Sequence, residues 1–329
     1  MAGLFTYLLG GAGIFLIGAS ESIFSSSETL KDISSLNSLQ PPTPNSKSKS
    51  KSKSITSLIF FSISLISFLF ILNSLISIIS ALKSNDQTGV VLQLQVISIS
   101  ILFFLFSILG LFTNLSNSIK IPSQLLNTLC LFAFIEEFIM FYLRKKDLDG
   151  IENRYYDLLL VPITVCIVCT LLELKGSSFK PGYSRLGRGV GLVLQGMWIV
   201  QMGFSFYSNL ITDGCFIKEK SRGNFTIRCK GHPEFHRARA IATLQFNCHL
   251  ALLVCFVVGM YGLVSKKYGV SSESLQYKPL GAEMQHLDQG RFTLDSDEDE
   301  DEVGDRNGGV KNEGNVAVET TVNGYGSHH

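Results

Sequence analysis

The chain has 329 residues, of which 46% are hydrophobic and only 17% are charged. A soluble domain carries about 25% charged residues, and the apolar residues here fall in long uninterrupted blocks, which excludes an ordinary soluble domain. The net charge of +1 hides a segregation, because acidic residues cluster at 295–302 and basic residues lie between the apolar blocks. This pattern does not indicate a nucleic-acid-binding surface, and no nucleic-acid partner is expected.

The apolar blocks are long enough to cross a bilayer, whose ~30 Å core requires ~20 residues of helix. Because backbone polar groups in lipid must be hydrogen-bonded within the segment, each block is predicted to be a helix. The blocks cover residues 3–23, 55–82, 90–115, 121–143, 155–174, 186–211 and 238–264. The sequence therefore predicts an all-α, multi-pass membrane bundle of about seven transmembrane helices, with the lipid bilayer as its first partner.

The remaining segments complete the expected organisation. Residues 1–24 are the first transmembrane helix, and residues 25–54, rich in Ser, Lys and Pro, are expected to be a disordered linker. Residues 55–265 supply the other six helices, with an extramembrane loop at 212–237. Residues 266–329 are polar and acidic, so we expect them to form a disordered tail.

The loop at 212–237 has the features of an oxidising compartment. Cys215 and Cys229 are spaced as a disulfide-bonded pair would be. Asn224-Phe-Thr226, between them, is an N-glycosylation sequon, which predicts a glycoprotein. These features favour a topology in which this loop and the N-terminus lie outside the cytosol.

The tail carries two motifs that act in the cytosol. Tyr277-Lys-Pro-Leu280 fits a Tyr-x-x-apolar sorting signal, and Ser296, followed by Asp-Glu-Asp, fits an acidophilic kinase site. Basic residues are nearly balanced between the two sides, so their count does not decide the orientation. The expected address is the secretory or endomembrane system or the plasma membrane, with sorting adaptors and a kinase as partners of a cytosolic tail.

Several polar side chains lie inside the predicted spans, where they are costly and therefore candidates for function. They are Glu136, Glu137, Glu173, Gln195, Trp198, Gln201, Asn247 and His249. Gln195, Trp198 and Gln201 recur every three residues, so they share approximately one helix face. Glu137 and His249 are the partners expected for this face. The group either joins helices by hydrogen bonds of ~0.6 kcal/mol each, or lines a polar cavity for a ligand, a proton or an ion.

Three segments carry a family resemblance. Residues 194–204 read Leu-Gln-Gly-Met-Trp-Ile-Val-Gln-Met-Gly-Phe, residues 137–142 have the form Glu-x-x-x-Phe-Tyr, and residues 240–249 end on His249. They are similar to segments of the transmembrane protein 45 family, also called the transmembrane epididymal protein family, in its plant-type form. The resemblance covers roughly residues 1–265. It implies seven spans and a membrane location, but no established activity.

The chain departs from that family at two positions. Arg144 and Tyr156 stand where family members often carry His. If the family's His cluster binds a metal, this chain has lost most of it. No metal, cofactor or catalytic residue is therefore predicted.

The function expected from these observations is that of a non-enzymatic membrane protein acting through partners or trafficking. The first alternative is a transporter or channel that uses Glu137, Gln195, Gln201 and His249 in a polar cavity. The second is an intramembrane hydrolase, which the scarcity of metal ligands within the spans disfavours. A seven-span receptor would rest on fold analogy alone.

Overall fold

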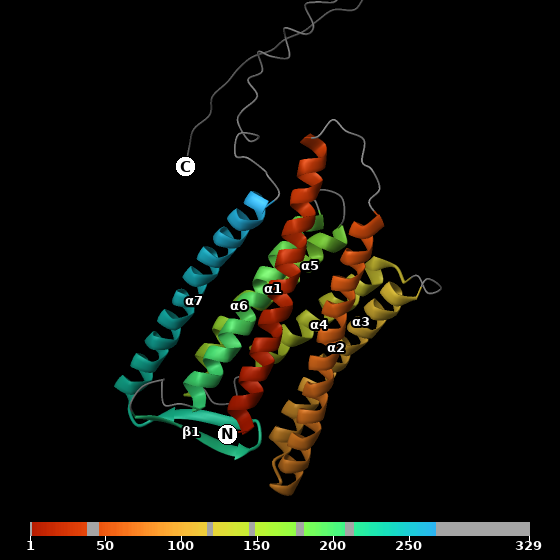
Figure 1. The fold of residues 1–329 in the computed structure, drawn as a ribbon. Helices are drawn as coiled ribbons and strands as arrows, with labels where there is room; N and C mark the ends of the chain where they lie inside the picture. Colours follow the sequence, from red (N-terminus) through yellow and green to blue (C-terminus); the bar gives the residue numbers. More distant parts are fainter. Residues whose placement is uncertain are drawn as a thin grey trace, which may run out of the picture. The chain divides into compact units, whose positions relative to one another are not determined.

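The structure is a computed structural model that describes residues 2–37, 46–116, 121–144, 149–175, 181–207 and 214–267. These residues form seven helices and one two-stranded antiparallel hairpin (Figure 1). The elements are α1 (Ala2–Asn37), α2 (Ser46–Lys83), α3 (Gln87–Leu115), α4 (Ser123–Leu143), α5 (Glu152–Lys175), α6 (Pro181–Tyr207), β1 (Cys215–Ser221), β2 (Asn224–Cys229) and α7 (His232–Lys267). All seven helices are long and apolar enough to cross a membrane, which confirms the predicted multi-pass helical bundle.

The bundle has two ends, which we name by the hairpin. The N-terminal end of α1 lies beside the β1–β2 hairpin (Figure 1). The chain reverses with every helix, so this hairpin side also carries the α2–α3 turn and the α4–α5 connection. The opposite side carries the connections from α1 to α2, from α3 to α4 and from α5 to α6.

The first connection differs from the disordered linker expected at 25–54. Helix α1 continues to Asn37, and α2 already begins at Ser46, so most of that segment is helical. Lys has a good helix propensity and Ser a moderate one, so low complexity alone does not prevent a helix. The three Pro at positions 41, 42 and 44 lie between the helices, in residues 38–45, outside the described part of the chain. Of the disordered tail expected at 266–329, residues 268–329 also lie outside it, whereas residues 266–267 are the end of α7.

Helices α1 and α6 pack along each other through glycines. A Cβ atom added to Gly18 would lie 2.6 Å from the backbone nitrogen of Val193 and 2.7 Å from the carbonyl oxygen of Gly189. At Gly11 an added Cβ would lie 2.8 Å from the carbonyl oxygen of Gly196. Small residues let helix backbones approach closely in lipid, where packing replaces the hydrophobic drive as the main source of association.

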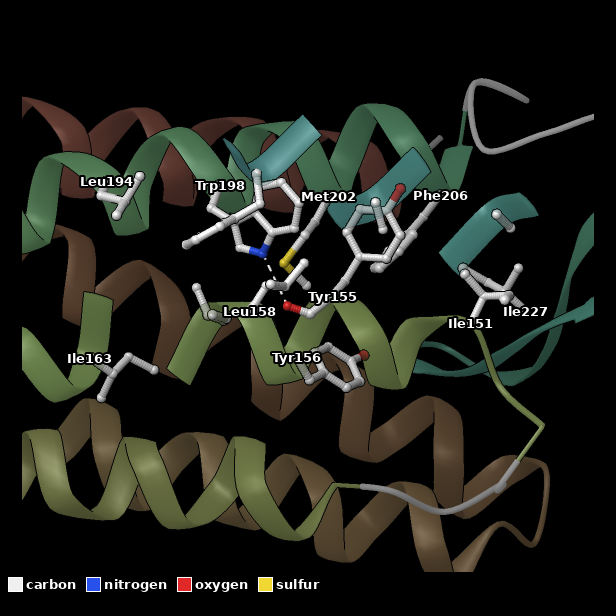
Figure 2. Close-up of a cluster of buried hydrophobic side chains, with 14 of the residues drawn as sticks. Ile151, Tyr155, Tyr156, Leu158, Ile163, Leu194, Trp198, Met202, Phe206 and Ile227 are labelled. Carbon is white, nitrogen blue, oxygen red and sulfur yellow. Dashed lines mark hydrogen bonds between the residues drawn. The ribbon is translucent and has the colours of Figure 1, made fainter. Parts of the chain in front are cut away.

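A large cluster of buried hydrophobic side chains joins α5, α6, α7 and the hairpin (Figure 2). Trp198 is fully buried there, and its ring stacks on Tyr155 at a centroid distance of 5.3 Å. The indole Nε1 donates a hydrogen bond of 3.0 Å to the carbonyl oxygen of Tyr155. Phe246 of α7 meets the same indole edge-to-face at 5.1 Å. The hydrogen bond to Tyr155 satisfies the indole N–H of Trp198, which would otherwise be an unpaired donor within the membrane.

The hairpin replaces what the sequence predicted only as a loop. Arg222 and Gly223 form its turn, where Gly223 has a φ of +83° that favours glycine. Its second strand is attached to α5, because the carboxylate of Glu152 accepts a 2.9 Å hydrogen bond from the Ile227 N–H. The Ile151 N–H donates to the Ile227 carbonyl at 3.2 Å. The hairpin is therefore an ordered cover on one end of the bundle.

Candidate functional site: an intramembrane cavity

A cavity of about 460 Å³ lies between the α2–α3 pair and helices α1, α4 and α6. Helices α2 and α3 pack mainly against each other, and α3 alone continues closely onto α4. The cavity walls are mostly Phe, Ile and other apolar side chains. It extends from the first turns of α6, on the opposite side, to the hairpin. Pockets of roughly 300–1,000 Å³ with apolar walls and a few polar groups are typical of small-molecule sites.

The middle of the cavity holds a carboxyl–amide pair. Glu137 of α4 and Gln195 of α6 are 8% and 1% exposed, and the Gln195 Nε2 donates a 2.6 Å hydrogen bond to the Glu137 carboxyl. The amide oxygen Oε1 of Gln195 is buried without a hydrogen-bond partner. Because an unpaired buried acceptor costs about 1–3 kcal/mol, this atom favours a ligand that brings a donor.

A second polar strip faces this pair across the cavity. It consists of buried serines on α2 and α3: Ser67, Ser74, Ser77 and Ser100. Ser77 and Ser100 donate to carbonyls of their own helices, both at 2.8 Å. The hydroxyl of Ser74 is 1% exposed and has no hydrogen-bond partner. Ser74 and Gln195 thus place unsatisfied polar atoms on opposite walls of the cavity.

The expected cluster of polar residues is divided by the structure. Gln195 meets Glu137, but Gln201 donates to Ser205 of its own helix at 3.1 Å. The His249 Nδ1 lies 2.8 Å from the carbonyl oxygen of Gln245, one turn earlier in α7. The His249 ring meets Trp198 edge-to-face at 5.8 Å. His249 therefore belongs to the α6–α7 contact and does not join Glu137.

The end of the cavity on the opposite side is closed by ion pairs. Arg188 of α6 is bonded to Glu21 of α1 and, at 2.6 Å, to Glu173 of α5. Glu173 also pairs with Arg185 at 3.2 Å. These two cations are thus each matched by a carboxylate. The network joins three helices, and breaking one partner of such a buried pair typically costs about 3–5 kcal/mol.

The hairpin end of the cavity carries two further guanidinium groups. Arg144 follows α4, contacts the ring of Tyr156 at 5.4 Å and makes a long 3.4 Å bond to the Gly223 carbonyl. Arg222, in the hairpin turn, donates to the Asn73 side chain at 2.9 Å. Burial disfavours the charged form of Arg144, yet neighbouring phenols and Glu152 raise its pKa above the ordinary value. Arg144 therefore remains a cation.

Asp86 fastens the hairpin to the α2–α3 turn. Its buried carboxylate accepts hydrogen bonds of 2.6 Å from both Ser221 and Asn224, and one of 3.1 Å from the Gly89 N–H. Lys220 lies 3.9 Å away. Burial alone would raise the pKa of Asp86, but these hydrogen bonds bring it below the ordinary value. The contact is thus strongest with Asp86 ionised.

The sequence predicted a disulfide and a glycosylation site at 212–237, and the structure contains the first but disfavours the second. The structure joins Cys215 and Cys229 through a disulfide at the base of the hairpin. Asn224 is only 6% exposed, and its Nδ2, the atom that a glycan would modify, donates to Asp86. Because this nitrogen is buried and engaged, the geometry disfavours a glycan there, and the glycosylation stays a prediction.

The other predicted residues lie apart from the cavity centre. Glu136 accepts a 2.8 Å bond from Ser98 on the outside of the bundle, and Asn247 is exposed on α7. Tyr277, Leu280 and Ser296 lie outside the described residues. Within the described ranges, no group of three or more His, Cys, Asp or Glu side chains is arranged to hold a metal ion.

Sequence reasoning missed most of the charged groups that line the cavity. The sequence pattern did not single out Glu21 or Arg188, and it marked Arg144 only as a replaced His. Asp86 was overlooked in a short turn. A charged residue inside an apolar block, as Glu21 is, was the one available signal.

Comparison with known proteins covers the second half of this bundle. Residues 123–262, from α4 to most of α7, match the model of a family described as a family of unknown function (DUF716). This family corresponds to the transmembrane protein 45 family. No curated protein matches the chain. The match includes Glu137, Gln195 and the hairpin, but neither α2 nor α3.

Proposed function

We propose that this protein is a non-enzymatic membrane protein that binds a lipid-like small molecule in the cavity between the α2–α3 pair and the rest of the bundle. The observation that carries the proposal is the 460 Å³ cavity with largely apolar walls and the Glu137–Gln195 pair at its middle. A cavity of this size suits a single-chain amphiphile. A hydroxyl or amide donor on that ligand would satisfy the Oε1 of Gln195.

Filling the cavity tests this proposal. Ser67 lines it and is 5% exposed, so Ser67→Phe would occupy ligand volume. Ser62 lies on the same helix outside the cavity lining, and its hydroxyl bonds to the Leu58 carbonyl of α2, so Ser62→Phe is the matched control. Full-length protein would be purified in detergent, and a fluorescent fatty acid titrated into each variant.

The proposal predicts binding to the wild type and to Ser62→Phe, with strong weakening in Ser67→Phe. Both variants must melt near the wild-type temperature for the comparison to count. Equal binding by the two variants would place the ligand on the outer surface and refute the proposal.

We propose further that the chain is a plant-type member of the transmembrane protein 45 family, resident in the secretory or endomembrane system. The disulfide of the hairpin supports an orientation with the hairpin side and the N-terminus outside the cytosol. The Tyr277–Leu280 and Ser296 motifs would then act on a cytosolic tail as adaptor and kinase sites. A tag after Val303 should become accessible when the plasma membrane alone is permeabilised. A tag that is labelled in intact cells, or that stays protected until the organelle membranes are also permeabilised, would reverse the orientation.

A further inference from the structure

The two ends of the cavity differ in how their cations are compensated. On the opposite side, Arg185 and Arg188 are both paired with carboxylates. On the hairpin side, Arg144 and Arg222 line the same cavity, and among the described residues neither forms an ion pair with a carboxylate. In the ranges that the structure describes, the guanidinium groups are thus paired with carboxylates on the opposite side but not on the hairpin side.

Arg144 is particularly short of partners. Among the described residues, its Nε–H is buried without a hydrogen-bond acceptor, and its side-chain hydrogen bond to the Gly223 carbonyl is 3.4 Å long. A buried guanidinium has five N–H donors and is stabilised best by a bidentate anion such as a carboxylate or phosphate. In the part of the chain that the structure describes, no carboxylate is bonded to Arg144 in this way.

Within the described ranges, the carboxylates near this end form no ion pair with Arg144 or Arg222. Glu219 lines the cavity but is exposed, and Glu152 acts on Arg144 electrostatically while it accepts a hydrogen bond from the Ile227 N–H. The ionised Asp86 is held by Ser221 and Asn224 instead of Arg144. The cations of this end are therefore available to an anion from outside the chain.

The surroundings of Arg144 also suit an anionic head on an apolar chain. Tyr207 lines the cavity at this end and can donate a hydrogen bond, and the apolar walls continue from there toward Glu137. We propose that the hairpin end of the cavity is an anion-binding subsite. Arg144 and Arg222 bind the carboxylate or phosphate head of a single-chain amphiphile, whose tail extends along the cavity. This inference rests on the proposed function, and it adds that the ligand has an anionic head group, which lies at the hairpin end of the cavity.

A pair of probes with the same chain tests it: oleate, which is anionic, and oleyl alcohol, which is neutral. Because hydrogen bonds to charged groups are roughly twice as strong as neutral ones, oleate should bind the wild type about tenfold more tightly or better. Arg144→Gln and Arg222→Gln should each remove most of that preference by weakening oleate binding far more than oleyl alcohol binding. Arg144→Lys, which keeps the charge, should retain part of it and covers the case in which Arg144→Gln fails to fold.

The matched control is Arg154→Gln. Arg154 lies in the first turn of α5, but it bonds to Thr243 of α7 at 3.0 Å and does not line the cavity. This variant should keep the preference for oleate. Equal affinity of the wild type for the two probes, or a preference that survives both Arg144→Gln and Arg222→Gln, would overturn the subsite.

Inorganic phosphate separates the failure of the subsite from the failure of the proposed function. It should compete with oleate and leave bound oleyl alcohol in place. If phosphate binds in an Arg144-dependent manner but neither oleyl probe binds, the anion subsite stands and the lipid-binding function is refuted. If oleyl alcohol binds and phosphate does not compete with oleate, the lipid-binding function stands and the subsite is refuted.

Discussion

The contact between α1 and α6 gives the sharpest stability prediction. In Gly18→Ala the new methyl group would meet the Val193 nitrogen at 2.6 Å and the Gly189 oxygen at 2.7 Å. Both are backbone atoms, which no rotamer change can move aside. The two helices must therefore separate locally.

The size of the effect follows from two opposed contributions. Overpacking a tight contact typically costs about 1–3 kcal/mol, whereas replacing Gly by Ala within a helix gains about 1 kcal/mol of helix propensity. Gly259 of α7 has no atom within 4 Å of its added Cβ, so Gly259→Ala receives the propensity gain without the clash. The difference between the variants isolates the clash, at about 1–3 kcal/mol.

Thermal unfolding of the two variants in the same detergent measures this difference. At about 2–4 °C per kcal/mol for a protein of this size range, Gly18→Ala should melt several degrees below Gly259→Ala. Equal melting temperatures would show that α1 and α6 are not packed backbone to backbone, and the wall of the cavity that they form would be in doubt.

Four further predictions concern the cavity and the hairpin. Glu137→Gln should be nearly neutral, whereas Glu137→Leu strands the Gln195 amide and should cost about 1–3 kcal/mol in thermal unfolding. Glycosidase should leave the protein's mobility unchanged, because the Nδ2 of Asn224 is bonded to Asp86; a shift would show that the hairpin packs differently. Thiol labelling of unreduced, denatured protein should miss Cys215 and Cys229, and full labelling would contradict the disulfide. Because the folded pKa of Asp86 lies below its unfolded value of ~3.9, its stabilisation is complete above that value and is lost as pH falls through the folded pKa. Proteolysis of the hairpin should therefore become faster at acid pH in the wild type, but not in Asp86→Asn. An acid dependence in that variant equal to that of the wild type would count against the contact.

The number and position of the helices could be predicted from the sequence, because a bilayer demands long apolar blocks and leaves few alternatives to a helix. The ends of the helices could not. Helix α1 runs to Asn37 because nothing in its polar extension forces a break before the prolines, whereas composition indicated a linker from residue 25. The membrane limits where apolar residues end, and not where a helix ends.

The candidate site could be predicted only in part. Glu137 and Gln195 are costly in lipid, so each was expected to have a hydrogen-bond partner, and the structure shows them bonded to each other. His249 was equally conspicuous, but a carbonyl of its own helix lies at its Nδ1, so it needs no distant partner. Spacing along a helix does not reveal such local satisfaction.

The residues that close the two ends depend on contacts between distant parts of the chain. Asp86 and Ser221 are separated by 135 residues, and Glu21 and Arg188 by 167. Arg188 lies at the edge of an apolar block, where a cation is usually exposed at the end of a span. Its role as a buried partner of Glu21 is visible only once α1 packs beside α6. The hairpin, which brings Arg222 to the cavity, formed in a segment whose composition indicated only a loop.

The most direct test of a ligand site inside the bundle is photo-crosslinking of the full-length protein with a diazirine-bearing fatty acid, followed by peptide mapping. A bound chain should label side chains that line the cavity, such as Phe70, Phe103 and Ile199, and excess oleate should suppress that labelling. Leu252 and Val258, exposed on α7, report contact with bulk lipid or detergent, and oleate should not protect them. Labelling confined to such outer positions, or cavity labelling that oleate does not suppress, would contradict a ligand-binding cavity.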